Sequence, residues 1–74
     1  MQQQYTGIYE KRGRWVVAYV EEIPGVNPQG RTLREARANL RDALRMVLEA
    51  NRQIAARLAV AGARREPLRV EVPA

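Results

Sequence analysis

Two stretches near the start of the chain have the pattern of apolar and polar residues that favours strands. Residues 4–10 contain two tyrosines, a threonine and an isoleucine, which are types enriched in strands. Residues 15–20 are apolar throughout, and the polar residues 11–14 between the two stretches include a glycine that can adopt positive φ. The pattern therefore predicts a β-hairpin with its turn at residues 11–14.

The second stretch is apolar on both faces of the predicted strand. Trp15, Val17 and Tyr19 alternate along one face, and two valines and an alanine occupy the other. A single helix covers only one face of a sheet, so the other face needs a second layer. We therefore expect a homo-oligomer of at least two copies, with Trp15, Val17 and Tyr19 in the interface. The alternative is a platform of Trp15, Tyr19 and Tyr5 on which bases stack, as in RNA-binding sheets.

A short third strand is predicted after this hairpin. Pro24 and Gly25 are typical of a turn, and residues 26–30 have the composition of a short strand. Pro28 lies inside that strand and has no N–H to donate. We therefore expect the third strand at an edge of the sheet.

A long helix is predicted from a capping box and an apolar stripe. Thr32 can accept a hydrogen bond from the N–H of Glu35, whose side chain can reach back to the N–H of Thr32. Apolar residues then recur at spacings of three and four, namely Leu33, Ala36, Leu40, Ala43, Leu44, Val47, Ile54 and Leu58. We expect the helix to run to about Val60, either unbroken or interrupted near Asn51, with Gly62 as a natural stop.

The chain ends in a second alternating pattern. Residues 68–72 alternate apolar and charged residues, which predicts a last strand with one apolar face. The element order is then β-β-β-α-β, an α+β arrangement with an antiparallel sheet. With 74 residues the chain is expected to form a single domain over residues 1–74.

The composition removes several classes of chemistry. The chain has no His, no Cys and no Ser, so we expect no histidine general base, no thiol or serine nucleophile and no transition-metal site. The carboxylates at strand ends and along the helix are interpreted as solvated or capping groups. No run of about 18 apolar residues and no leader pattern is present. We therefore expect a cytoplasmic, non-enzymatic protein without cofactor, metal or membrane contact.

The positive charge is concentrated in arginine. Thirteen basic residues against eight acidic ones give a net charge of +5, and all the basic residues except Lys11 are Arg. At about 100° per residue, five of them fall in one narrow sector away from the apolar stripe. This arginine stripe comprises Arg34, Arg37, Arg41, Arg45 and Arg52. It is either a solvated face, relieved where Asp42 and Glu49 lie near Arg45, or a surface for phosphates or an acidic partner.

Three segments of the chain form a specific combination. The first is Tyr5–Glu10, the second is Trp15–Gly25 with the sequence WVVAYVEEIPG, and the third is Gln29–Leu44 with the sequence QGRTLREARANLRDAL. In this combination and spacing, over about residues 4–50, the chain resembles the HicB-like antitoxin family.

The resemblance implies a partial ribonuclease-H-like fold without ribonuclease activity. HicB-like proteins bind and block a small HicA-type toxin that cleaves mRNA, so the resemblance implies such a toxin as partner. Many members carry an added DNA-binding domain, for which we expect no room in residues 1–74. HicA-type toxins are basic, so a chain of charge +5 would need a local acidic patch such as Glu10, Glu21 and Glu22.

Two further functions stay open at this point. One is a stand-alone nucleic-acid-binding module that uses the arginine stripe, which would bind RNA or DNA in a salt-dependent way. The other is an oligomeric binding domain with an unidentified ligand.

Overall fold

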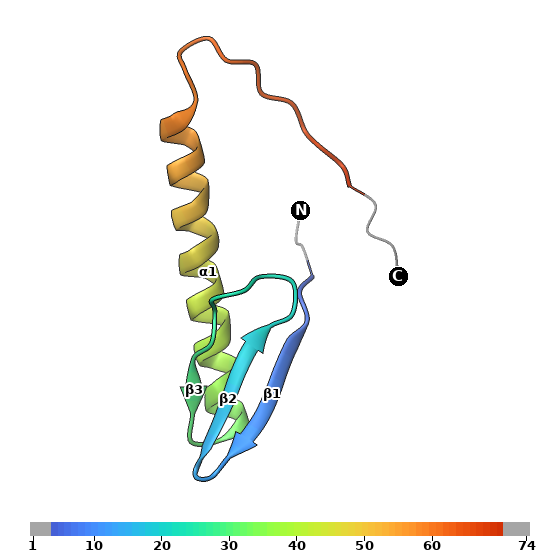
Figure 1. Cartoon of the computed structure of the whole chain (residues 1–74), viewed down its shortest axis with the longest axis vertical. Coiled ribbons are helices and arrows are strands. Elements are labelled where there is room, and N and C mark those ends of the chain that lie inside the picture. The colour runs from blue at the N-terminus through green and yellow to red at the C-terminus, as the bar shows by residue number, and fades with distance from the viewer. Residues whose placement is uncertain (1–3, 71–74) are drawn as a thin grey trace.

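The computed structural model describes residues 4–70 and contains one sheet and one helix. The strands are β1 (Gly7–Arg12), β2 (Trp15–Val20) and β3 (Gln29–Gly30), and the helix is α1 (Leu33–Leu58). The sheet is antiparallel with the order β1-β2-β3, and the first half of α1 packs across one of its faces (Figure 1). The α+β class predicted from the sequence is confirmed.

The hairpin forms where the sequence predicts it, but its first strand is shifted along the chain. Pairing runs from Gly7 opposite Val20 to Arg12 opposite Trp15, so β1 begins and ends later than the predicted residues 4–10. The turn is therefore shorter than predicted. Gly13 occupies it with φ of 61°, a conformation that glycine adopts without steric cost.

The third strand is shorter than predicted. Only Gln29 and Gly30 pair with β2, although Ala18 also donates a backbone hydrogen bond of 2.9 Å to the carbonyl of Pro28. Pro28 accepts that bond but has no N–H to continue the ladder, which is why the strand cannot extend toward Val26. Val26 is instead buried in the core. The expected position at an edge of the sheet is confirmed.

The helix begins at the predicted cap and runs without a break. The Thr32 hydroxyl accepts a hydrogen bond of 3.1 Å from the N–H of Glu35, whereas no reciprocal bond from Thr32 to the Glu35 side chain is present within residues 4–70. The interruption near Asn51 does not occur. The helix ends at Leu58, before Gly62, which lies with φ of 83° in a separate turn.

The core is small and lies between the sheet and the first half of α1. Its buried side chains are Ala18, Val20, Val26, Ala36 and Leu40. Ala43, Leu44 and Val47 are partly buried against this cluster. The predicted apolar stripe is therefore confirmed from Ala36 to Val47. Leu33 at the start of the helix is 43% exposed, and the stripe has no cover in the second half of α1.

The predicted last strand is not formed in the described part of the chain. Residues 68–70 have no regular structure, and residues 71 and 72 lie outside the described residues. After α1 the chain turns over and runs back as an irregular segment (Figure 1). Leu68 is 87% exposed, because the alternating pattern supplies an apolar face but no neighbouring strand to pair with. Along residues 4–70, no helix is both long enough and apolar enough to cross a bilayer.

Candidate functional site

The face of the sheet that points away from α1 carries the aromatic residues of β2. Val17 and Tyr19 are half-buried on this open face, and Trp15 at its end is 39% exposed. Ala18 and Val20, which alternate with them, are buried under the helix. The structure thus places Trp15, Val17 and Tyr19 together, and their role in an interface between copies stays a prediction.

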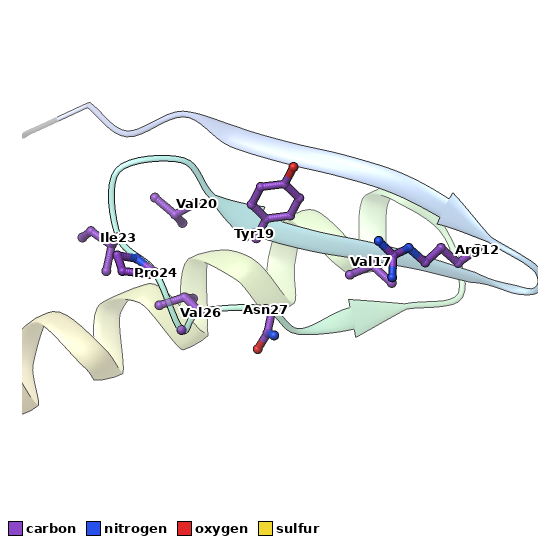
Figure 2. A pocket seen from close by; sticks show the side chains of 9 residues that line it. Arg12, Val17, Tyr19, Val20, Ile23, Pro24, Val26 and Asn27 are labelled. Atoms are coloured by element: carbon purple, nitrogen blue, oxygen red, sulfur yellow. The ribbon is translucent and has the colours of Figure 1, made fainter.

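A hollow of about 300 Å³ lies on this open face, where the chain leaves β2. Val17 and Tyr19 line it from the strand, and Ile23 and Pro24 line it from the following loop, while the Arg12 side chain reaches in from β1 (Figure 2). Apolar and polar atoms line the hollow in nearly equal parts, and Arg12 and Asn27 supply polar groups. This mixed lining suits a side chain of a partner protein that carries both apolar and polar atoms.

The carboxylate of Glu10 on this face forms an ion pair with Arg12. It accepts a hydrogen bond of 3.0 Å from Arg12 Nη2 and a long one of 3.4 Å from the Tyr19 hydroxyl. Within residues 4–70, no three His, Cys, Asp or Glu side chains are grouped closely enough to hold a metal ion.

A second carboxylate fastens the segment before β1 to the end of β2. Glu22 accepts hydrogen bonds from the backbone N–H and the hydroxyl of Thr6, at 2.8 and 2.7 Å. These two bonds, the backbone one above all, hold the pKa of Glu22 below its ordinary value of 4.5. Of the acidic patch expected from the sequence, Glu10 and Glu22 are therefore engaged within the chain.

The arginine stripe is divided by its contacts. Arg37 lies 5.9 Å from the centre of the Tyr9 ring, and Arg52 forms hydrogen bonds of 2.7 and 3.1 Å with Glu49. This pairing raises the pKa of Arg52 and lowers that of Glu49. Glu49 therefore pairs with Arg52 and forms no ion pair with Arg45 within the described residues.

Three members of the stripe form neither an ion pair nor a ring contact within the described residues. They are Arg34, Arg41 and Arg45, and all three are exposed. They leave a short row of free guanidinium groups on the first half of α1. This part of the stripe fits the expectation of a charged binding surface.

The apolar stripe predicted for the helix continues into the second half of α1, where it is exposed. Ile54 is 55% and Leu58 is 79% exposed, although both follow the helical sector of Leu40 and Val47. The helix has 26 residues and is about 39 Å long, whereas a six-residue strand spans about 20 Å. The difference between these two lengths predicts that the second half of the helix extends beyond the sheet, so that its apolar side chains are exposed.

A contact between an aromatic ring and a cation at the hairpin end was also missed. The Arg31 guanidinium carbon lies 5.8 Å from the centre of the Trp15 ring. The signal for it is the register of the sheet. Because Gly30 pairs with Val16, the next residue, Arg31, falls beside Trp15.

Comparisons of the sequence with models of protein families and with curated proteins found no match, and a comparison with solved structures found none either.

Proposed function

We propose that this chain is a non-catalytic HicB-like antitoxin-type protein that binds and neutralises a HicA-type mRNA-cleaving toxin. The observation that carries the proposal is a correspondence between motif and fold. The three segments that resemble the family are the segments that form β1, β2 and the unit of β3 with the start of α1. Under this proposal the sheet and helix are the first part of a partial ribonuclease-H-like fold.

The hollow on the open face is the part of the surface that best suits a toxin. It offers half-buried apolar side chains from two elements, the strand with Val17 and Tyr19 and the loop with Ile23. Apolar anchors that fill such hollows dominate the binding energy of protein interfaces. A docking mode based on shape also avoids the repulsion that a net charge of +5 would cause with a basic toxin.

Co-purification with the protein encoded by the adjacent reading frame tests this proposal. We expect a stable complex that Val17→Thr with Tyr19→Thr weakens by more than about tenfold, since both changes keep strand-forming residues but remove apolar contacts. As matched control, Arg34→Gln, Arg41→Gln and Arg45→Gln together should leave affinity within about tenfold. Absence of a complex, or loss only in the arginine variant, would refute the proposal.

We also propose that the chain is a homo-oligomer. The exposed stripe of Ile54 and Leu58 on α1 is a surface for this association that leaves the open face of β2 accessible. Burying the exposed parts of these two side chains on each of two copies would supply roughly 4–8 kcal/mol. That is on the scale of the roughly 4–15 kcal/mol that association costs.

The free arginines of α1 favour a second candidate function, binding of duplex nucleic acid. Arg34, Arg41 and Arg45 lie in one row without ion pairs within residues 4–70. If each contacts a phosphate of duplex DNA, changing all three to Gln should flatten the slope of log K against log salt by up to about 2.7. Weak binding that this variant leaves unchanged would exclude the candidate.

A further inference from the structure

We propose that the hairpin end of the molecule holds a binding site for one unpaired nucleotide of a single-stranded nucleic acid, formed by Arg14, Trp15 and Arg31. This site is separate from the hollow proposed for the toxin and does not depend on it. Arg14 and Trp15 begin the second arm of the hairpin, and Arg31 follows β3. The three side chains line a hollow of about 300 Å³.

The guanidinium groups of the two arginines are available to bind a phosphate. Neither Arg14 nor Arg31 forms an ion pair within residues 4–70, whereas Arg12, Arg52 and Arg64 each pair with a glutamate. Arg31 lies over the indole ring at 5.8 Å, which positions its guanidinium beside an aromatic surface. A phosphate placed here would meet two free guanidinium groups next to a ring.

The surroundings of the site are basic. Figure 1 shows that the β1–β2 turn, the connection from β3 to α1 and the first turn of α1 lie at the same end of the molecule. This end carries five of the thirteen basic residues, namely Lys11, Arg12, Arg14, Arg31 and Arg34, together with the acidic Glu35 of the first turn of α1. The nearby Glu10 is paired with Arg12. A field of this sign attracts a polyanion to the hairpin end.

The exposed indole ring of Trp15 distinguishes a single-stranded nucleic acid from other polyanions as the ligand. Trp15 is 39% exposed, and it stands apart from Tyr5, which packs against the core, and from Tyr19, which is half-buried. An unpaired base can stack on such a ring while its phosphate binds arginine, and bases within a duplex are not free to do so. An acidic peptide would use the guanidinium groups alone. The combination therefore favours a single strand over a duplex or an acidic peptide.

The single tryptophan makes the test direct. Titration of the intact protein with a short single-stranded RNA should quench the emission of Trp15, because a base stacks on its indole ring. The signal reports on this site alone, since the chain has no other tryptophan. The same sequence as single-stranded DNA distinguishes RNA from DNA as the source of the nucleotide, and binding of either supports the site. A duplex of the same length and an oligoglutamate peptide serve as the competing ligands. If either of these binds as tightly as the single strand, the proposal is wrong.

Variants separate this site from general charge attraction. Arg14→Gln with Arg31→Gln should lower the salt slope measured with labelled single strands by about 1.4, two contacts at about 0.7 each. Trp15→Leu should weaken binding by about fivefold or more, and Trp15→Phe should restore part of it, because base stacking is lost and then partly regained. Arg65→Gln with Arg69→Gln removes the same charge from the exposed C-terminal segment and should change affinity by less than about twofold.

Circular dichroism of each variant checks that the fold is kept, and exposed positions such as Arg14 and Arg31 are expected to tolerate the change. Equal weakening by the two arginine pairs would overturn the proposal. So would a wild-type emission that single strands leave unchanged.

Discussion

A Cβ atom added to Gly30 would lie 2.6 Å from the backbone nitrogen of Ala36, so β3 and the first turn of α1 meet backbone to backbone. Ala36 is completely buried at this contact. The Asn39 side chain donates a hydrogen bond of 2.9 Å to the carbonyl of Gln29 and fastens the same pair of elements. The close approach sets how the helix leaves the sheet, and therefore which way its exposed half points.

Replacing this glycine should loosen the contact. Gly30→Ala forces the backbone of α1 to move, and overpacking of this kind costs about 1–3 kcal/mol of unfolding free energy. Gln29→Ala, on the same strand with an exposed side chain, should cost less than about 0.5 kcal/mol. Urea denaturation of both variants measures the difference. Equal midpoints would mean that β3 and α1 do not touch as described.

The cap and the core of α1 should contribute unequally to stability. Thr32→Ala removes the hydrogen bond to the N–H of Glu35 and should cost about 1 kcal/mol. Leu40→Ala leaves a cavity in the buried cluster and should cost about 2–5 kcal/mol. Denaturant midpoints with unchanged m-values give both numbers. If Thr32→Ala lowered the free energy of unfolding as much as Leu40→Ala does, the burial of Leu40 in the core would be contradicted.

The bonds between Thr6 and Glu22 should make the attachment of the N-terminal segment depend on pH. Because folding lowers the pKa of Glu22, the stabilisation is present above its ordinary pKa and is lost as the pH falls through the lowered value. Glu22→Gln should abolish this dependence. An NMR titration of the Glu22 carboxyl carbon and the Thr6 amide tests it. A Glu22 pKa at or above 4.5 would contradict the hydrogen bonds.

The oligomer should depend on the exposed apolar stripe of α1. Ile54→Gln with Leu58→Gln keeps good helix formers and should shift the chain toward the monomer of 8.4 kDa in analytical ultracentrifugation. Val17→Thr with Tyr19→Thr tests the interface predicted from the sequence in the same experiment. Gln53→Ala, on the outer side of the helix, is the control. A wild type that sediments only as the monomer would exclude the oligomer.

Local signals predicted the elements whose partners are close in sequence. The hairpin, the cap at Thr32 and the buried positions Ala36 and Leu40 follow from turn chemistry and from helical spacing. The first and last residues of these elements could not be predicted from the same signals. The shortness of β3 depends on Pro28 and on the close approach of Gly30 to α1, which spacing alone does not reveal.

The surface features depended on geometry between elements. The exposed Ile54 and Leu58 share the periodicity of the core and differ from it only because the sheet ends before the helix does. The contact of Arg31 with Trp15 requires the register of β2 and β3. The last strand was predicted from alternation, but Leu68 has no neighbouring strand in the described chain.

The central proposal is tested most directly by the cleavage of mRNA by the toxin that we propose as partner, measured with and without this chain. The account predicts that an equimolar amount of the chain lowers the cleavage rate by about tenfold or more, and that Val17→Thr with Tyr19→Thr restores cleavage. Cleavage that stays unchanged at about a tenfold molar excess of the chain would contradict it.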